Sequence, residues 1–281
     1  MKFYIVDAFT SEPFGGNPAG VVLLEHADFP CDELMQQVAA ELRYSETAFV
    51  RYEGNSTFTL RYFTPCGEVD LCGHATIASF GVLLHEGVVS KGETCFIHTL
   101  AGDLQVVADE QVMMQMATST LLPTAVDAER LHRIMGGDIM QWPSLPIEVI
   151  STGLPDIMLP VASLDALHAL QPDMDALAEM SQELGVTGVH SFALSDDGYT
   201  AHTRNFAPLY GIPEESATGT ASGALTHYLQ RNGIIEASCT CRFMQGEAMN
   251  RPSVIVTQLQ ADGSIMVGGN IRIIAHGNLQ L

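Results

Sequence analysis

Two short segments combine glycine with small polar residues at the expected start of a helix. The first is Cys72-Gly73-His74, which precedes the apolar run ATIASFGVLL. The first N–H groups of a helix have no partner inside the helix and carry partial positive charge, so they favour a bound anion. Gly73 would let a ligand approach the backbone closely, and His74 beside a helix end is expected to be neutral and able to hydrogen-bond or pass a proton. The segment therefore predicts a carboxylate site.

The second segment, Thr218-Gly219-Thr220, stands 146 residues after the first. RYFTP at 61–65 also recurs as RNFAP at 204–208, and an acidic stretch follows each. Both segments are followed, at the same distance, by a glycine that would end the helix, Gly87 and Gly233. This common order predicts a duplicated domain. If the two domains face each other, two helix N-termini point into one cleft.

Such a cleft needs a group that moves protons, and Glu46 is the candidate. It stands in YSETAF, where an amphipathic helix is expected to end and a strand to begin. The flanking apolar residues would partly desolvate the carboxylate, which favours a general acid or base. Glu215, three residues before Thr218, could hold or tune a neighbouring group, and Asn17 could donate an amide N–H into the cleft.

Simpler explanations exist for each of these residues. Glycine also allows a helix to pack tightly against a sheet, and a glutamate is usually a solvated surface or helix-end residue. His74 could equally be a buried, hydrogen-bonded histidine. Cys72 is expected to be a packed apolar residue, although a helix N-terminus would also activate a thiol. Thr218 occupies the matching place in the repeat, which disfavours a racemase with two thiols.

Composition excludes several classes of function. The chain has 281 residues, 47% of them hydrophobic, and 33 acidic against 12 basic side chains give a net charge of −21. Nucleic acid and anionic membranes are therefore poor partners, and no apolar run approaches the roughly 20 residues of a membrane span. Six scattered cysteines and the absence of a targeting segment predict a cytoplasmic protein with reduced thiols. Cys239 and Cys241 are expected to pack without a metal.

Strands and helices without regular alternation predict an α+β fold. Residues 118–125 are expected to separate two domains, 1–118 and 119–281, with the last strand able to pack back onto the first domain. The hydrophobic patterns predict the following elements. The expected strands include 2–9, 19–24, 47–53, 57–65, 147–152, 156–161, 190–195 and 199–208, and the expected helices include 32–43, 75–86, 126–135 and one that begins at 220.

Five motifs, taken together, resemble the phenazine-biosynthesis PhzF-like isomerase family, a branch of the diaminopimelate-epimerase fold. They are DAFTSEPFGGNPAGVV, YSETAFV, RYFTP, LCGHATIA and ATGTASGAL, and they occur in order from Phe3 to the second special helix. The resemblance implies two pseudo-symmetric diaminopimelate-epimerase-like domains, each a barrel-like β-sheet around a central helix. It also implies an active site that uses no metal and no organic cofactor.

The same resemblance assigns roles to individual residues. Glu46 falls on the acid/base of the family's SET motif, and its histidine falls on His74. The better-studied members carry Asp in place of Glu215 and Ser in place of Thr220, so the pocket differs and the substrate is not fixed by the resemblance. The residues expected to be catalytic are Glu46, His74, Glu215 and Thr220, and those expected to bind substrate are Asn17, Ser45, Gly73, Thr218 and Gly219.

We therefore expect an isomerase that moves a proton at a carbon near a carboxylate of a small, cyclic or amino-acid-like metabolite. Two alternatives stay open. One is a one-base or Cys72-dependent epimerase or racemase of amino or hydroxy acids, and the other is a non-catalytic protein that binds small carboxylates. The expected partner is a small carboxylate, with no nucleic acid and no membrane, and a homodimer is left open.

Overall fold

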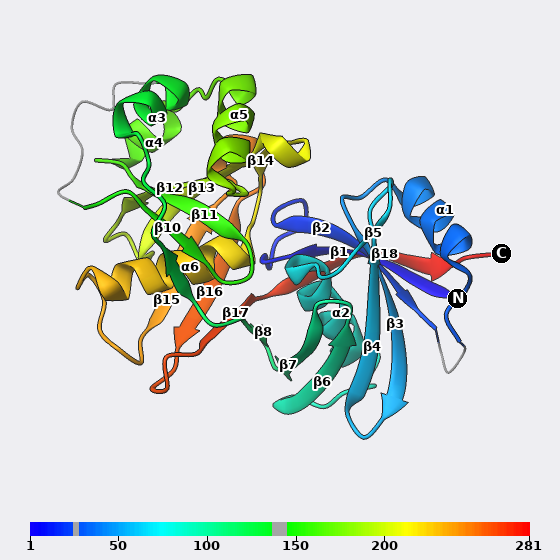
Figure 1. The fold of residues 1–281 in the computed structure, drawn as a ribbon. Helices are drawn as coiled ribbons and strands as arrows, with labels where there is room; N and C mark the ends of the chain where they lie inside the picture. Colours follow the sequence, from blue (N-terminus) through cyan, green and yellow to red (C-terminus); the bar gives the residue numbers. More distant parts are fainter. Residues whose placement is uncertain (25–27, 137–144) are drawn as a thin grey trace. The chain divides into compact units, whose positions relative to one another are not determined.

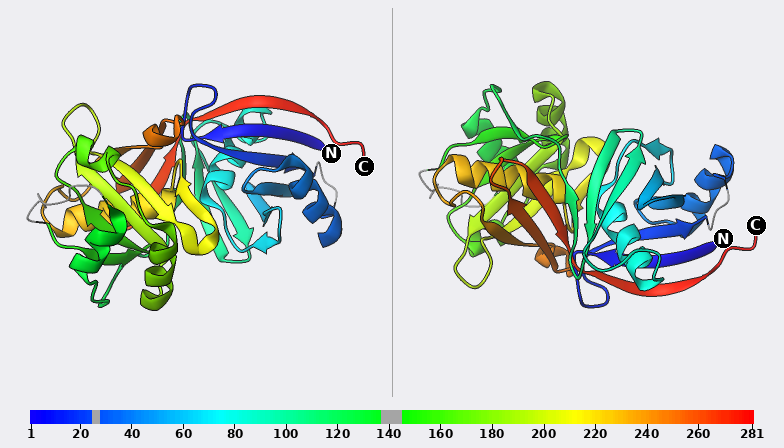
Figure 2. Two further views of the ribbon diagram at one scale, coloured as in Figure 1. Left: turned by 90° about the horizontal axis from the view of Figure 1, so that it is seen from above. Right: turned by 90° about the horizontal axis from the view of Figure 1, so that it is seen from below.

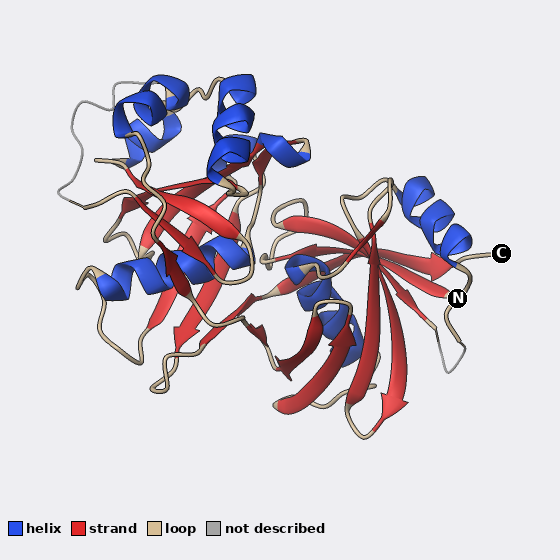
Figure 3. Ribbon diagram, in the orientation of Figure 1, coloured by secondary structure: helices blue, strands red, loops and turns tan. Residues whose placement is uncertain are grey.

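The computed structural model describes residues 1–24, 28–136 and 145–281. Contacts divide the chain into two compact units (Figure 1). Unit 1 contains residues 1–115 and 268–281, and unit 2 contains residues 116–267. Strands form most of each unit and helices are few (Figure 3), so the predicted α+β class is confirmed. None of the described helices is long and apolar enough to cross a bilayer.

Unit 1 is a sheet that surrounds one apolar helix. Strand β1 (Lys2–Ala8) pairs antiparallel with β2 (Asn17–Leu23), β2 pairs parallel with β3 (Thr47–Gly54), and β3 pairs antiparallel with β4 (Thr57–Phe63). The remaining elements before the chain leaves this unit are α1 (Asp32–Leu42), β5 (Glu68–Val69), α2 (Gly73–His85), β6 (Glu93–Thr99), β7 (Gly102–Ala108) and β8 (Val112–Gln115).

Helix α2 is the centre of unit 1. Every residue from His74 to Leu83 is buried, as expected for a helix that is apolar on all sides and lies in a core. It contacts strands β1, β2, β3, β7, β8 and β18 (Ile271–Asn278). A side chain at Gly81 would collide with Ile271 of β18, because a Cβ atom there would lie 2.2 Å from Ile271 Cγ1. The sheet therefore closes around the helix at van der Waals distance.

The last strand of the chain belongs to unit 1. Strand β18 pairs antiparallel with β1, from Lys2 opposite Asn278 to Ala8 opposite Ile271. Both views in Figure 2 show these first and last strands side by side, with the two termini next to each other. The N–H group of Leu279 donates to the carbonyl oxygen of Met1, which ties the ends together.

Unit 2 repeats the strand pairings of unit 1 in the same order. Strand β10 (Glu148–Ser151) pairs antiparallel with β11 (Pro155–Pro160), β11 pairs parallel with β12 (Gly188–Leu194), and β12 pairs antiparallel with β13 (Ala201–Ala207). The other strands are β9 (Thr120–Leu122), β14 (Ile212–Glu215), β15 (Thr240–Gln245) and β16 (Ser253–Leu259), and β17 (Ile265–Gly269) begins in this unit and ends with two residues of unit 1. The helices are α3 (Ala128–Met135), α4 (Leu164–His168), α5 (Met174–Leu184) and α6 (Gly219–Arg231), with short 3₁₀ turns at Pro208–Tyr210 and Glu247–Met249.

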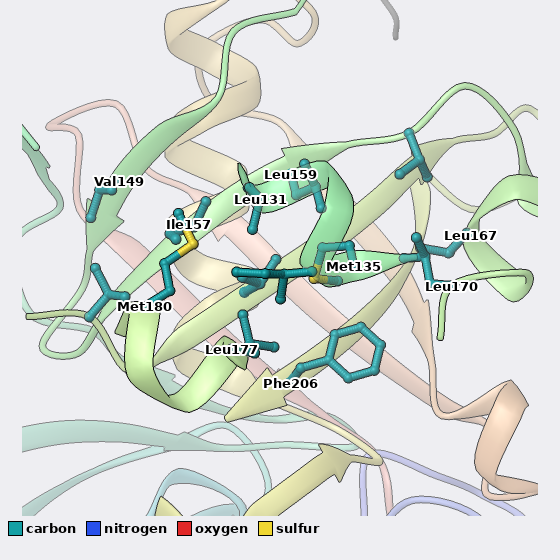
Figure 4. Close-up of a cluster of buried hydrophobic side chains, with 14 of the residues drawn as sticks. Leu131, Met135, Val149, Ile157, Leu159, Leu167, Leu170, Leu177, Met180 and Phe206 are labelled. Carbon is teal, nitrogen blue, oxygen red and sulfur yellow. The ribbon is translucent and has the colours of Figure 1, made fainter. Parts of the chain in front are cut away.

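The sheet of unit 2 has a buried core on each face. One core joins the sheet to α3, α4 and α5, and Figure 4 shows side chains such as Leu131, Leu177 and Phe206 meeting in it. The other core packs the opposite face against α6, through Met158 and Phe192 among others. Because neighbouring residues of a strand point to opposite faces, the strands from β10 to β13 contribute to both cores.

The repeated helices end in the same way. Gly87 and Gly233 both have φ of +70°, a conformation that favours glycine. In each case the glycine N–H bonds back to the chain three residues earlier, and the next N–H, of Val88 or Ile234, bonds back five residues. This is the Schellman arrangement expected where glycine follows a helix.

Two kinds of connecting segment contain short strands. Residues 118–125, expected to separate the two domains, include β9, which pairs with β10. The acidic stretches after RYFTP and RNFAP contain the short strands β5 and β14, which pair with β4 and β13. These strands have only two to four residues and depend on pairing with another strand, so local patterns do not reveal them.

Candidate active site

In unit 1 a carboxylate faces an imidazole at the start of α2. Glu46 directly precedes β3, and the N–H group of Gly20 in β2 donates to its carbonyl oxygen at 3.1 Å. Glu46 Oε2 lies 3.3 Å from His74 Nε2, on the second residue of α2. The Glu46 side chain is 18% exposed and that of His74 is 7% exposed. Apart from this contact, Oε2 is buried with no hydrogen-bond partner among the described residues.

The other predicted unit 1 residues surround the same imidazole. Asn17 Nδ2 lies 3.4 Å from His74 Nδ1, and Ser45 Oγ lies 3.4 Å from His74 Nε2. Cys72 Sγ lies 3.4 Å from Nδ1. The structure thus brings together the residues that separate motifs of the sequence suggested.

Burial decides the ionisation state of His74. It lowers the pKa of the imidazole and outweighs the opposite effects of the Glu46 charge and of a ring N–H bond to the Pro18 carbonyl oxygen. His74 is therefore neutral near pH 7, with one ring N–H and one lone pair. A neutral imidazole beside a carboxylate can share or relay a proton without holding a permanent charge.

The N-cap residue of α2 does not cap the helix with its side chain. This residue is Cys72, which makes no side-chain cap hydrogen bond. A Cβ atom at Gly73 would meet only the end of the Met114 side chain, at 3.6 Å. A helix start without a side-chain cap can hold a carboxylate, and Glu46 beside it can exchange a proton with the bound molecule.

The matching segment of unit 2 is a hydrogen-bonded cluster at the start of α6. Thr218 Oγ1 donates to Glu215 Oε2 at 3.0 Å, and the Thr218 N–H group donates to Gln245 Oε1 at 3.2 Å. Gln245 Nε2 donates to the Glu215 carbonyl oxygen at 2.7 Å. Gly219 is the first residue of α6, and the Thr220 carbonyl oxygen accepts a hydrogen bond from the Thr152 hydroxyl at 2.8 Å.

Sequence reasoning missed Gln245 and the buried Asp156. Gln245 ends β15, 27 residues after Thr218, and nothing in CRFMQ indicates that its side chain is fully buried against another turn. Asp156 carried a signal, because an acid within the apolar strand PDIMLP is unusual. It is 1% exposed in the structure.

A metal site was not expected, and the described residues include one group of ligand types. Atoms of Glu46, Cys72 and His74 lie within 4.8 Å of one another, and such residues bind zinc in other proteins. The carboxylate faces Nε2, however, whereas the sulfur is closer to Nδ1, at 3.4 Å, than to Nε2, at 3.8 Å. A single ion would bind one ring nitrogen, so the three groups would have to move to share it.

Solved structures define the class of fold. A hydroxyproline epimerase from Agrobacterium vitis superposes with a TM-score of 0.65 at 14% identity, over 99% of this chain and 90% of that one. This similarity shows the fold alone. A phenazine biosynthesis protein of the PhzF family from Bacillus anthracis superposes with a TM-score of 0.88 at 26% identity, over 100% and 99% of the two chains.

The family follows from sequence. A family model described as phenazine biosynthesis-like protein matches residues 6–277, and the chain belongs to this family. A relative from Deinococcus radiodurans named uncharacterized isomerase is 37% identical over 95% of this chain and 91% of its own. The trans-2,3-dihydro-3-hydroxyanthranilate isomerase of Pseudomonas aeruginosa is 30% identical over 100% and 99%. The predicted family is confirmed, and relatives in it are named isomerases.

Proposed function

We propose that the protein is an isomerase that moves a proton at a carbon near a carboxylate of a small metabolite, with Glu46 as base and then as acid. The observation that carries the proposal is the contact of Glu46 Oε2 with the neutral His74 imidazole at the start of α2. Membership of a family with named isomerases supports the reaction class. The substrate class is a cyclic or amino-acid-like carboxylate.

The reaction balances with one proton carrier. Glu46 takes a proton from a carbon, and the electron pair of the broken C–H bond moves into the adjacent unsaturated system and its carboxylate. The N–H groups at the start of α2, from Gly73 onward, bind the carboxylate and stabilise the added charge. Each such donor would contribute about 3 kcal/mol to the transition state. The protonated Glu46 then returns the proton to another carbon.

The neighbours of Glu46 position the reacting groups. His74 relays or shares the proton, while Asn17 and Ser45 hold the imidazole or the substrate through their polar atoms. In unit 2, Glu215 and Thr220 are proposed to orient substrate or share protons, and Thr218 and Gly219 to bind it. These steps need only proton carriers and hydrogen-bond donors, so the proposed reaction uses no cofactor.

The strand register supports a single base at the Glu46 position. Val189 pairs with Phe206 in unit 2 as Thr47 pairs with Phe63 in unit 1, so Gly188 is the counterpart of Glu46. A Cβ atom at Gly188 would lie 1.9 Å from the Phe206 carbonyl oxygen. Unit 2 therefore has no room for a second carboxylate at that position.

Solvent isotope exchange tests the base. Native protein, E46Q and the control E41Q, an exposed acid on α1, would be incubated in D₂O with trans-2,3-dihydro-3-hydroxyanthranilate and with other cyclic carboxylates. Native protein and E41Q should incorporate deuterium, and E46Q should be slower by about 10²- to 10⁴-fold. Equal incorporation by E46Q and native protein would refute the assignment.

A thiol-dependent epimerase is a second candidate, because Cys72 Sγ lies 3.4 Å from His74 Nδ1. The two functions differ in C72A, which should keep deuterium exchange if Glu46 is the base and lose it if the thiolate is. The non-catalytic alternative predicts that a carboxylate raises the melting temperature although no deuterium enters it. A homodimer and a cytoplasmic location stay predictions.

A further inference from the structure

Four polar side chains lie on one face of consecutive strands in unit 2. They are Asp156 on β11, His190 on β12, Asn205 on β13 and Glu215 on β14. His190 pairs with Asn205, and Asn205 pairs with Glu215. The strand neighbours of the first three side chains are Ile157, Val189 and Phe206, which all belong to the core beneath α3, α4 and α5. The four polar side chains therefore face α6.

The first turn of α6 lies over the start of β11. Thr152, in the turn before that strand, donates its hydroxyl to the Thr220 carbonyl oxygen. Ile150, which pairs with Asp156, packs in the core beneath α6. Asp156 thus lies below the same helix start at which Glu215 accepts the Thr218 hydroxyl.

Unit 1 has no carboxyl group at the position of Asp156. Gly20 pairs with Thr47 in unit 1 as Ile157 pairs with Val189 in unit 2, so Gly20 and Ile157 are counterparts. The residues before them, Ala19 and Asp156, are therefore counterparts too. Ala19 is fully buried and Asp156 is 1% exposed. The fold accepts a methyl group at this place, and a buried carboxyl group without a cation is costly there.

No positive charge compensates Asp156 among the described residues. Its Oδ1 atom is buried and has no hydrogen-bond partner in the part of the chain that the structure describes. His190 is neutral, because burial lowers its pKa to about 4 against the effect of its bond from Nδ1–H to Asn205 Oδ1, at 3.1 Å. The part of α6 from Gly219 to Thr226 carries no titratable side chain. The acid on β10, Glu148, pairs with Met158 and so lies further along the sheet than Asp156. Burial is the larger cause and the Glu215 charge the smaller one, and together they raise the pKa of Asp156 to about 7.

We propose that Asp156 is a positioning residue of the unit 2 site, a buried carboxylic acid on the same face of the sheet as Glu215 that keeps its proton, so that the two groups carry one negative charge, on Glu215. A charge on Asp156 would be fully buried and would also be repelled by the charge of the partly buried Glu215, so ionisation of both carboxyl groups is costly. Glu215 is the better place for the charge, because it accepts a hydrogen bond at the start of α6, where negative charge is favoured.

The proposal deepens the role given to Glu215 and, for catalysis, rests on the proposed function. An anionic Glu215 can accept a proton or a hydrogen bond from substrate while Asp156 keeps the second charge out of the site. Above neutral pH, Asp156 would ionise and add that charge. Protonation of Asp156 can be measured without any substrate, so the two proposals fail separately.

Infrared spectroscopy of the intact protein tests the protonation. At pH 6 most of the 33 acidic side chains are ionised, so a buried protonated carboxyl group gives a resolved C=O stretching band. The native protein and the control D165N, an exposed acid of unit 2, should show the band and lose it around pH 7. D156N should lack it. A band that persists in D156N, or no band in the native protein, would overturn the proposal.

A second variant tests the coupling to Glu215. In E215Q the like charge is gone while burial is unchanged, so the midpoint of the Asp156 band should fall by about 1 pH unit and stay above that of an exposed aspartate. An unchanged midpoint would refute the pairing. For catalysis, the rate of deuterium exchange by the native protein should decline above pH 7, and this decline should be absent in D156N. If the exchange rate of D156N declines above pH 7 as that of the native protein does, while the infrared results are as expected, the positioning role is refuted. Glu46 would still be the base.

Discussion

Of the two facing groups at the start of α2, Glu46 is the one able to carry the negative charge. Burial keeps the facing His74 imidazole neutral although a carboxylate lies 3.3 Å away. A neutral ring can both accept and donate a hydrogen bond, which a protonated ring cannot. Glu46 can therefore give up or take a proton without breaking an ion pair, and this is what a base that later becomes an acid requires.

His202 should make the stability of unit 2 depend on pH. Its Nδ1 lies 2.6 Å from Glu247 Oε2 and its Nε2 lies 2.9 Å from Asp197 Oδ2. Burial lowers the pKa of the imidazole, but the two carboxylates outweigh it and the net effect raises the pKa. This stabilisation is complete below the ordinary histidine pKa and is lost as pH rises through the folded value. We expect the free energy of unfolding to fall above about pH 6.5, by on the order of 1 kcal/mol, in urea titrations.

The H202Q variant should remove this dependence, because glutamine has no titrating charge. The matched control is H98Q in unit 1, since His98 is half exposed beside the exposed Asp103. Surface pairs of this kind contribute little to stability. If the free energy of unfolding of H202Q depends on pH as that of the native protein does, the assignment of this dependence to His202 is wrong.

Some site residues could be predicted from sequence and others could not, for a physical reason. Glu46 and His74 stand in compact motifs whose neighbours already show a helix start or a strand start. Gln245 and Asp156 become part of a site only through the register of β11 with β12 and of β13 with β12, β14 and β15. A one-residue change in register would turn either side chain to the other face, and local sequence does not determine that register.

Among the elements, strand β12 has very little room for change at Gly188. Gly188 lies against the Phe206 carbonyl oxygen of β13, and a Cβ atom would approach that oxygen to 1.9 Å. In G188A the backbone of β12 or β13 must move, so we expect a loss of about 3 kcal/mol in the free energy of unfolding. Chemical denaturation measures it.

The control for this change is G67A. A Cβ atom at Gly67 would meet no other atom within 4 Å, and the φ angle of this glycine is not positive. Alanine there should therefore change the free energy of unfolding by less than about 0.5 kcal/mol. Equal stability of G188A and G67A would show that β12 and β13 separate easily.

Helices were easier to predict than short strands. Helix α2 combines a continuous apolar run with a terminal glycine, and both signals are local. Strand β9 has three residues and β5 has two, and each depends on hydrogen bonds to a strand defined elsewhere in the chain. The repeat between the two halves was visible because its motifs mark turns and helix ends, where few residue types fit.

For the whole molecule, the decisive feature is the return of the chain to unit 1. Removal of residues 271–281 would leave β1 without its partner on one side and expose Gly81 of α2, where Ile271 packs. We expect amide hydrogen exchange to lose protection throughout unit 1, while unit 2 keeps it. Deletion of residues 279–281 alone is the control. Full protection of unit 1 in the longer deletion would contradict this role of β18.

The order of the chain also sets the order in which the units can be completed during synthesis. All of residues 116–267 leave the ribosome before the strand that unit 1 still lacks. The nascent chain therefore carries an unfinished sheet edge along β1 while the later unit already has every strand it needs. At a synthesis rate of about 5–20 residues per second, that edge stays open for roughly 10 seconds or more, a period in which chaperone binding or mispairing with another nascent chain can compete with folding.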